Sequence, residues 1–469
     1  MQYFSNSPAL TALRADKDKL VVLILVAVSA GAALAVQAPA YPNHDVSYLT
    51  WVAHRVSTSA VFGRDIREVN PPLAFLIYVP ALFGGATGLA IKLWITALAC
   101  LSLTTLSRAV PSEMRIPVVG ALGLFFAFAF PREFGQREQI ALVLCAPYVA
   151  GHLSSKGWAI LSGVMAGIGF ALKPHFLIPL LLVFMARRRV GTEEKAIAAA
   201  GVLYAVSILV FFQPYLRALP SLAGSYWSVG TNTYSVHHLW HYLAQLIPAL
   251  ALGWLNRDGR TLGFAAASVG FAIAAVLQQK FFAYHFLAAW GFLILFLAAQ
   301  LAQPRRRLLV ALLLIVVTAE LGNWTRPWFH HQASRNAEVA ALVQTIDASD
   351  GFTALSIHPY PAFPAAIYSA KPYLGSSAGL FGLAAIGKLT MAGQPVPASL
   401  ARSTLDQVLA ELRRRPGLVI VQTNWSLFDD LSGYDALEWL LRDAEFRRLW
   451  GDYAPAGRIG DYRLYRRTR

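Results

Sequence analysis

Long apolar stretches recur through the first two thirds of the chain, from Leu20 to Leu321. Of the 469 residues, 56% are hydrophobic and only 14% are charged, which leaves too little polar surface for a water-soluble protein of this size. The pattern predicts a polytopic α-helical membrane protein. We expect about eleven spans, near 20–38, 89–107, 116–131, 140–153, 157–172, 175–186, 195–212, 242–256, 262–278, 281–300 and 307–322.

The first apolar run follows Arg14, Lys17 and Lys19, as the apolar part of a signal peptide would. Because the run is long enough to cross a bilayer and further spans follow, we interpret it as an uncleaved first span. The two cysteines, Cys100 and Cys145, both lie in apolar runs. They are expected to be small buried side chains, since neither a disulfide framework nor a zinc-binding spacing is present in the sequence.

The net charge of +15 lies in short basic clusters between the apolar runs, which is typical of membrane topology and not of nucleic-acid binding. The apolar segment 71–83 is much shorter than the roughly 20 residues that a crossing needs, so we expect a short interfacial helix there. All basic clusters then fall on one side, which the positive-inside rule makes cytoplasmic. The clusters are Arg14/Lys17/Lys19, Arg108/Arg115, Lys156, Arg187 to Arg189 with Lys195, Arg257/Arg260 and Arg305 to Arg307.

After Leu321 the sequence changes character, with more arginine, aspartate and proline and with shorter apolar runs. We predict a membrane module over 1–322 and a small α/β domain over 323–469, on the side opposite the basic clusters. The expected strands lie near 352–357, 418–421 and 460–465, and the expected helices near 403–415 and 435–441, the last with Asp435 as its N-cap.

The loop after the first span carries the polar residues His44, Asp45, Tyr48 and Arg55 on the side opposite the basic clusters. A carboxylate at the membrane surface can accept a proton from a hydroxyl group or bind a metal ion. Asp45 could also cap a helix that begins at Val46, and the two roles are compatible.

The same loop continues with a second acidic pair, Asp65 and Glu68. The two residues are three apart and would share one helical face, which makes Glu68 a candidate second acid. The alternative is a solvated surface on which the two carboxylates pair with Arg64 and Arg67.

Charged residues also stand at the outer end of the third predicted span, where Arg137 and Glu138 occur side by side. Charges at a membrane edge are costly and therefore indicate a use. Arg137 could bind a phosphate through its planar fork, and Glu138 could orient it or act as a second acid. The alternative is an arginine–glutamate pair that ends two helices.

Two further polar interruptions each combine a lysine and a histidine, namely Lys173 with His175 and Lys280 with His285, the latter beside Tyr284. A lone lysine in such a position could simply extend its ammonium group to the lipid headgroups. Two such interruptions on the same side fit an anionic lipid phosphate better.

The segment between the seventh and eighth spans is rich in aromatic and histidine side chains, which could form an interfacial belt or stack on sugar rings. His237 and His241 share a helical face, but the sequence shows no third metal ligand, so we predict no metal site there. The residues concerned are Tyr226, Trp227, Tyr234, His237, His238, Trp240 and His241.

With these motifs the chain resembles the GT-C superfamily of membrane glycosyltransferases, which includes dolichyl-phosphate-mannose mannosyltransferases and aminoarabinose transferases. The resemblance rests on His44-Asp45 with Tyr48, on Asn70-Pro71-Pro72-Leu73, on the polar motif at Arg137, on Gln278 to His285, and on the trailing α/β domain. It implies a bacterial inner-membrane enzyme that moves a sugar, with inversion, from a polyprenyl-phosphate donor to an envelope glycan, lipid or protein. The α/β domain would then be periplasmic, and membrane lipids would surround the spans.

The resemblance also implies roles for single residues. Asp45 is the expected catalytic residue, and the leaving phosphate is expected to bind Arg137, Lys173, His175, Lys280 and His285. Further substrate contacts are expected from His44, Tyr48, Arg55, Tyr284, His237 and His238. No cofactor is certain, and a divalent metal ion is possible. Many relatives carry a paired acidic motif beside the first-loop acid, whereas the neighbour of Asp45 here is His44, so metal dependence stays open.

Two other classes remain open at this stage. A polysaccharide ligase or polymerase uses similar donors but is expected to have a large late loop in place of a folded domain. A transporter of lipid-linked glycans is expected to show internal repeats and polar groups at the bilayer midplane, and the sequence has no visible repeat.

Overall fold

The structure, a computed structural model, describes residues 8–85, 87–228, 236–256, 261–303, 306–423, 431 and 433–468. The predicted roles of Tyr234, Arg257, Arg260 and Arg305 therefore concern residues outside the described ranges. Contacts along the chain divide it into two compact units. The helical unit comprises Met1–Pro39, Lys92–Tyr204 and His237–Phe329, and the α/β unit comprises Ala40–Ile91, Ala205–Val236 and His330–Arg469.

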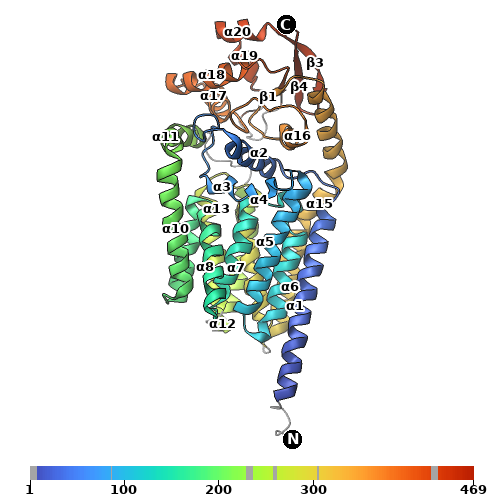
Figure 1. The fold of residues 1–469 in the computed structure, drawn as a ribbon, viewed down its shortest axis with the longest axis vertical. Coiled ribbons are helices and arrows are strands. Elements are labelled where there is room, and N and C mark those ends of the chain that lie inside the picture. The colour runs from blue at the N-terminus through green and yellow to red at the C-terminus, as the bar shows by residue number, and fades with distance from the viewer. Residues whose placement is uncertain are drawn as a thin grey trace. The chain divides into compact units, whose positions relative to one another are not determined.

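The helical unit is a bundle of antiparallel helices, and Figure 1 shows α1, α5, α6, α7 and α8 running side by side. Every predicted span coincides with one of its helices. They are α1 (Pro8–Gln37), α5 (Gly88–Ala109), α6 (Ser112–Phe128), α7 (Arg137–Ala150), α8 (Lys156–Ala171), α9 (Leu177–Arg187), α10 (Thr192–Phe211), α12 (His237–Asn256), α13 (Leu262–Leu277), α14 (Leu287–Gln300) and α15 (Arg307–Asp347), with the short 3₁₀ helices η1 (Pro131–Glu133), η2 (Pro174–Phe176) and η5 (Ala283–Phe286).

Five segments are long and apolar enough to cross a membrane by length and composition alone: Asp18–Gln37, Gly88–Ala109, Thr192–Phe211, Ala283–Gln300 and the helix Arg307–Asp347. Shorter apolar helices accompany them in the bundle, at Lys156–Ala171, Pro174–Arg187 and Leu262–Leu277. The predicted class, a polytopic helical membrane protein, is confirmed. The figure of about eleven crossings stays a prediction.

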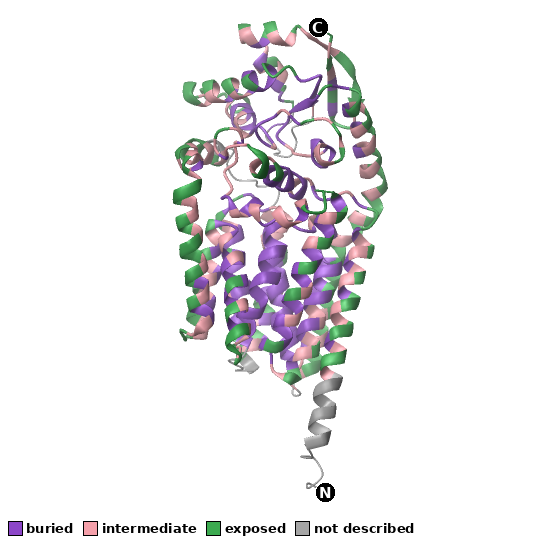
Figure 2. Ribbon diagram, viewed as in Figure 1, coloured by how far each residue is buried: buried purple, intermediate pink, exposed green. Residues whose placement is uncertain are grey.

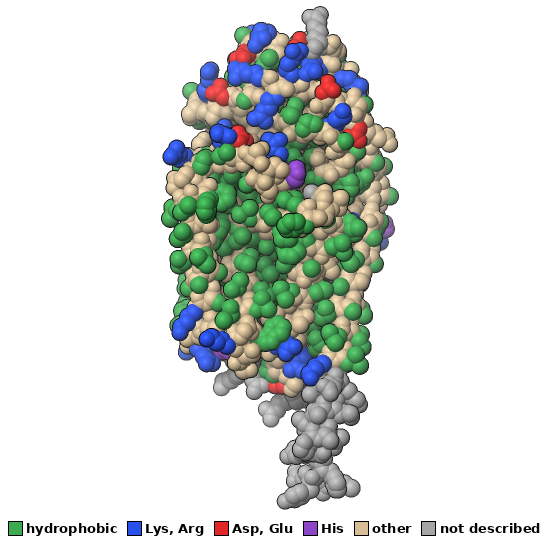
Figure 3. All heavy atoms as spheres, in the orientation of Figure 1, with side chains coloured by type: hydrophobic (Ala, Val, Ile, Leu, Met, Phe, Trp, Pro, Cys, Tyr) green, Lys and Arg blue, Asp and Glu red, His purple; other side chains and the backbone are tan. Residues whose placement is uncertain are grey.

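One end of the bundle carries the basic clusters. The guanidinium group of Arg115 lies 3.6 Å from Asp18, and that of Arg108 lies 4.4 Å from the ring centroid of Trp158. Figure 3 shows hydrophobic side chains along the bundle and lysine and arginine side chains gathered at this end. Basic side chains gathered at one end of an apolar helical bundle follow the positive-inside pattern.

The other end of the bundle is held by polar contacts that join α1 to its neighbours. The amide of Gln37 donates to the carbonyl of Pro131 at 2.8 Å, and the ammonium of Lys92 donates to the carbonyl of Gln37 at 2.7 Å. The hydroxyl of Thr325 in α15 donates to the carbonyl of Phe128 at 3.2 Å. Helices α5 and α7 therefore begin at this end of the bundle. Helices α1 and α6 and the membrane part of α15 end there.

Helices α7 and α14 form the interior of the bundle, and all their residues are buried (Figure 2). Small residues let neighbouring helices approach closely, as is usual where lipid provides no hydrophobic driving force. A side chain at Gly270 of α13 would overlap the backbone of Pro179 in α9. A side chain at Gly163 of α8 would likewise overlap the carbonyl of Glu193 in α10.

The α/β unit contains a four-stranded sheet in the order β1-β2-β4-β3. Strand β1 (Phe352–Leu355) pairs parallel to β2 (Leu418–Gln422), which is antiparallel to β4 (Tyr462–Arg467), and β4 pairs antiparallel to β3 (Tyr453–Ile459). Its helices are α2 (His44–Thr58), α3 (Leu73–Leu76), α4 (Val79–Leu82), α11 (Gln213–Ser228), α16 (Ala362–Tyr368), α17 (Phe381–Met391), α18 (Ala398–Leu412), α19 (Ala436–Leu440) and α20 (Ala444–Trp450).

Helices α17 and α18 pack with β1 and β2 around a core that includes Leu383, Val408, Val419 and Val421. The predicted strands and helices of this region are confirmed, and Asp435 is the N-cap of α19, as expected. The predicted division at 322/323 falls inside α15, which continues unbroken to Asp347.

Three local features differ from the sequence expectation. Helix α2 is capped by Asn43, whose side-chain oxygen accepts from the backbone N–H of Asp45, so Asp45 does not take the cap position that the sequence left open to it. The predicted single helix 71–83 is two helices of one turn each, α3 and α4. Most of the aromatic segment before His237 is helical, as α11, because its apolar side chains recur with helical spacing.

We predict that Gly270→Val destabilises the bundle by about 1–3 kcal/mol, because the added methyl groups cannot fit against Pro179 and α9 has to shift. Thermal unfolding of the detergent-solubilised protein, followed by circular dichroism, measures the effect. Gly201→Val is the matched control, since a side chain at Gly201 in α10 meets no atom within 4 Å. Equal midpoints for the two variants would contradict close packing of α9 on α13.

Candidate functional site

The first-loop acid, Asp45, lies in the first turn of α2 in the α/β unit. Its side chain is 22% exposed, and its Oδ1 lies 3.8 Å from Nε2 of His44. The ring of His44 in turn contacts the ring of His358, with centroids 4.7 Å apart. His358 is held from behind, because its Nδ1 accepts from the backbone N–H of Tyr360 at 3.1 Å. The Asn43 cap and the two histidines therefore fix a partly exposed carboxylate beside a basic ring.

The remaining first-loop candidates lie along α2 behind Asp45. Tyr48 is 3% exposed and packs edge-on to Phe363, at 5.2 Å between centroids, in an aromatic cluster shared with Trp51. Arg55 lies with its guanidinium 5.5 Å from the ring centroid of Trp51. Burial, and then the nearby Glu68 charge, raise the pKa of Tyr48 well above its ordinary value. Tyr48 is therefore a neutral core side chain in this structure.

Glu68 is oriented by its own loop. Its Oε1 accepts from the backbone N–H of Asn70 at 3.0 Å and from the side-chain amide of Asn70 at 2.7 Å. The other acid of this loop, Asp65, is bound by Arg64 at 3.0 Å, as the solvated-surface alternative predicts for one of the two carboxylates. Glu68 has a different environment from Asp65, because it lies near Tyr48 and lines a pocket in the α/β unit.

A second group of candidates is buried in the helical unit, at the end opposite the basic clusters. Nζ of Lys173 donates to Oε1 of Glu138 at 2.5 Å and to Oε1 of Gln278 at 3.0 Å. Lys173 is 4% exposed and Glu138 is not exposed at all. Residues from three separate predicted interruptions of the apolar pattern, at α7, at η2 and after α13, thus meet in one place.

Four further basic side chains complete this group, which we call the buried cation cluster and define as Arg137, Glu138, Lys173, His175, Gln278, Lys280 and His285. Arg137, Lys173, His175 and Lys280 all lie near enough to His285 to interact with it electrostatically. Arg137, Lys280 and His285 are each 5% exposed or less. The cluster contains three permanent cations and one carboxylate, which leaves two positive charges in excess.

An excess of buried positive charge is expensive unless an anion offsets it. Among the described residues, Nε2 of His175, Nδ1 of His285 and Oε2 of Glu138 are buried without a hydrogen-bond partner. Polar atoms buried in this way are usually satisfied by water or by a ligand. A phosphate monoester carries close to two negative charges near neutral pH and accepts several hydrogen bonds, so it matches both the charge and the donors of the cluster.

The backbone around Lys280 is held in an unusual conformation. Gln279 and Phe281, which flank Lys280, both have positive φ angles, of 55° and 50°. Such angles cost roughly 1–3 kcal/mol each in residues other than glycine and are often found at functional sites. They direct the chain from α13 into η5, where the ring of Tyr284 lies with its centroid 5.7 Å from Nζ of Lys173.

The histidines at the start of α12 form a separate group at the same end of the bundle. Nδ1 of His241 lies 2.9 Å from Oε1 of Glu320, and the ring centroids of His238 and Trp324 are 4.4 Å apart. Glu320 is the acidic neighbour that could not be found from sequence spacing, because it lies in α15. Among the described residues, these histidines do not form a group of three ligand atoms close enough together to hold one metal ion.

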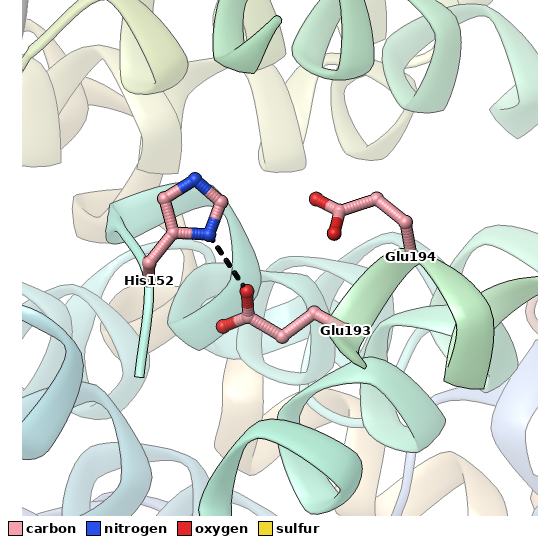
Figure 4. A group of neighbouring side chains, drawn as sticks. All are labelled: His152, Glu193 and Glu194. Carbon is pink, nitrogen blue, oxygen red and sulfur yellow. Dashed lines mark hydrogen bonds and ion pairs between the residues drawn. The ribbon is translucent and has the colours of Figure 1, made fainter. Parts of the chain in front are cut away.

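One other group of described residues does bring three such atoms together. It consists of His152, Glu193 and Glu194, whose ligand atoms lie within 4.8 Å of one another (Figure 4). Arg187 occupies the centre of this group, with its Nη2 2.6 Å from Glu193 and its Nε 3.1 Å from Glu194. Nδ1 of His152 is 2.9 Å from Glu193. Both carboxylates are therefore bound by a guanidinium that a metal ion would have to displace, so we assign the group as an ion-pair network.

The structure brings one of the predicted sets of residues together in the helical unit. Arg137, Glu138, Lys173, His175, Lys280, Tyr284 and His285 form one neighbourhood in the helical unit. His44, Asp45, Tyr48, Arg55 and Glu68 all belong to the α/β unit, and the convergence of Asp45 with the cations stays a prediction. Sequence reasoning missed His358 and Glu320, since no local motif marks a residue whose partner is far away in the sequence.

No protein-family model matches the sequence, and no curated protein matches it. Among solved structures the chain is similar to that of ArnT from Cupriavidus metallidurans in the apo state, with 11% sequence identity and a TM-score of 0.54. The alignment covers 95% of this chain and 97% of that one. At such a low sequence identity, the structural similarity is evidence for the fold alone. The chain therefore has a GT-C-like fold, and the aligned residues include both of its units.

We predict that Lys173→Met destabilises the protein by about 3–5 kcal/mol, because it leaves the carboxylate of Glu138 buried without its partner. The double variant Glu138→Gln/Lys173→Met, which removes both charges, should recover much of that loss. Unfolding midpoints of the four proteins of this double-mutant cycle measure the coupling. Additive effects of the two single changes would show that the pair does not act as a unit.

Proposed function

We propose that this protein is a membrane glycosyltransferase that moves a sugar from a polyprenyl-phosphate donor to an acceptor on the cell envelope. The observation that carries the proposal is the buried cation cluster, with two positive charges in excess at the bundle end that lies opposite the basic clusters. The GT-C-like fold supports it. Because the positive-inside rule makes the basic end cytoplasmic, the cation cluster and the α/β unit would face the periplasm of a bacterial inner membrane.

The cation cluster suits the leaving group of this reaction. Negative charge on the phosphate increases as the bond between the sugar C1 and the phosphate oxygen breaks, and fixed cations stabilise that change more than they stabilise the bound donor. Arg137 would hold the phosphate through two parallel hydrogen bonds. Lys173, Lys280, His175 and His285 would provide the remaining donors, with Glu138 keeping the ammonium of Lys173 in place.

Asp45 is the proposed general base. In this mechanism the acceptor hydroxyl oxygen attacks the sugar C1 from the side opposite the phosphate, which inverts the anomeric configuration. The hydroxyl proton passes to Asp45, and the electron pair of the broken bond leaves with polyprenyl phosphate. His44, 3.8 Å from Asp45, would keep the carboxylate ionised before the proton arrives.

The sugar and the acceptor class can be identified by mass spectrometry of envelope glycolipids and glycoproteins from a strain that lacks the protein. The species that loses a sugar names the acceptor, and the mass difference names the sugar. An unchanged envelope, together with no transfer by the purified protein from any polyprenyl-phosphate sugar of that strain, would overturn the proposal.

We predict that Asp45→Asn lowers the rate of transfer by at least about 100-fold, because the amide cannot take the proton. Folding should be unaffected, since the Asn43 cap bonds the backbone N–H of residue 45, which the substitution retains. Transfer by purified protein, with thermal unfolding alongside, measures both effects. Asp65→Asn, in the same loop but paired with Arg64, is the matched control and should retain transfer. Normal transfer by Asp45→Asn would remove the assignment.

We predict that Arg137→Ala raises the KM for the lipid-linked donor by about tenfold or more, because a charged hydrogen bond to the phosphate is lost. Arg132→Ala is the matched control, since Arg132 is five residues away and 45% exposed. Steady-state kinetics at varied donor concentration distinguish the two variants. Equal donor KM values for both would make Arg137 a structural residue of the cluster.

A further inference from the structure

The α/β unit contains a pocket of about 60 Å³ that is separate from the aromatic cluster behind Asp45. A cavity that holds a single water molecule needs roughly 10–15 Å³, so the pocket has room for a small polar group. Three parts of the unit line it: the loop before α3, helix α11, and helices α17 and α18 with the segment that precedes them. The residues that line the pocket include Arg67, Glu68, Tyr226, Ser377, Phe381 and Gln407.

Arg67 is the cation of this pocket. Its backbone N–H donates to the carbonyl of Ser376 at 2.7 Å, which fixes the loop against the C-terminal part of the unit. Its Nε is buried without a hydrogen-bond partner in the described part of the chain. Arg67 also lines the pocket, and a guanidinium group there can bind an anionic or strongly polar group.

The floor of the pocket is a network of oriented hydroxyl and amide groups. The side-chain amide of Gln407 donates to Oγ of Ser377 at 2.9 Å and to Oγ of Ser376 at 3.2 Å. Beneath it, the buried carboxylate of Glu411 accepts from the hydroxyls of Ser376 and Thr353, both at 2.9 Å. These bonds hold the lining groups at fixed positions, as a binding site requires.

One side of the pocket is aromatic. Tyr226 of α11 packs edge-on against Phe381 of α17, with ring centroids 5.3 Å apart, and both rings line the pocket. Across from them, Glu68 is held by Asn70 through one carboxylate oxygen. A cation, a carboxylate, hydroxyl groups and an aromatic wall together are typical of sites that bind sugars, whose rings offer both hydroxyl groups and an apolar face.

We propose that this pocket is a subsite for the acceptor, in which Arg67 binds the anionic group, carboxylate or phosphate, of an acidic sugar. The inference rests on the proposed function and adds the chemical class of the acceptor to it. The volume suits the anionic group itself, with the sugar ring lying at the mouth against Tyr226 and its hydroxyl groups reaching Glu68 and Gln407.

Saturation-transfer NMR on the purified full-length protein in detergent tests the pocket with three probes: sodium glucuronate, glucose 6-phosphate and glucose. At least one of the two anions should bind measurably more tightly than glucose. Preference for glucuronate assigns a carboxylate, and preference for glucose 6-phosphate assigns a phosphate. Arg67→Ala should weaken binding of the preferred anion by about tenfold or more, which corresponds to the loss of a charged hydrogen bond.

Two variants control for indirect effects. Arg64→Ala removes an arginine of the same loop whose side chain is 68% exposed and paired with Asp65, and it should leave anion binding unchanged. Ser403→Trp keeps Arg67 but fills the pocket that Ser403 lines, and it should abolish binding. Equal binding of all three probes, or anion binding that survives both Arg67→Ala and Ser403→Trp, would overturn the proposal.

The NMR experiment needs no turnover, so the two proposals can fail separately. Anion binding that depends on Arg67, in a protein that transfers no sugar, would remove the transferase assignment and leave the pocket in place. Sugar transfer whose acceptor KM is the same in Arg67→Ala and Arg64→Ala, without anion binding, would retain the transferase and remove the subsite.

Discussion

The ion pair between Glu138 and Lys173 is the interaction on which the polar site of the bundle depends. Both side chains leave water almost completely, which costs several kcal/mol for each ion before any attraction is counted. The pair is stabilised by the 2.5 Å bond between its charges and by the additional acceptor that Gln278 provides. Without Glu138, the ammonium of Lys173 would lie among Arg137, Lys280 and the two histidines with no negative charge inside the cluster.

This arrangement explains why an apolar bundle contains charged residues at all. Hydrophobic side chains of the same size at 138 and 173 would be cheaper to bury, so stability alone does not account for the pair. A single carboxylate also fails to neutralise three cations. Within the cluster as defined, cations outnumber the carboxylate, and we propose that a bound phosphate adds negative charge there.

The sequence predicted the helices well because each has to be apolar over its length, and that requirement is local. It also predicted that Arg137, Lys173, Lys280 and His285 act together, since polar interruptions on one side of a membrane have to share the few places where charge is tolerated. The cap of α2 stayed open because Asn43 and Asp45 are both good N-cap residues, and only backbone geometry chooses between them. His358 and the Arg67 pocket could not be predicted, because each is formed by segments brought together only in the folded α/β unit.

The two buried charged clusters of the helical unit contain similar residue types, and the hydrogen bonding of their polar atoms distinguishes them. In the network of His152, Arg187, Glu193 and Glu194, the two carboxylates bond the guanidinium and also accept backbone N–H groups, from Leu153 and Gly191. Each carboxylate oxygen thus has a hydrogen-bond partner, and the network joins the segment after α7 to α9 and α10 at the basic end. In the cation cluster, by contrast, buried nitrogen atoms of His175 and His285 have no hydrogen-bond partner among the described residues. This difference is the physical reason why we propose the donor phosphate at the cation cluster and not at the network of Arg187.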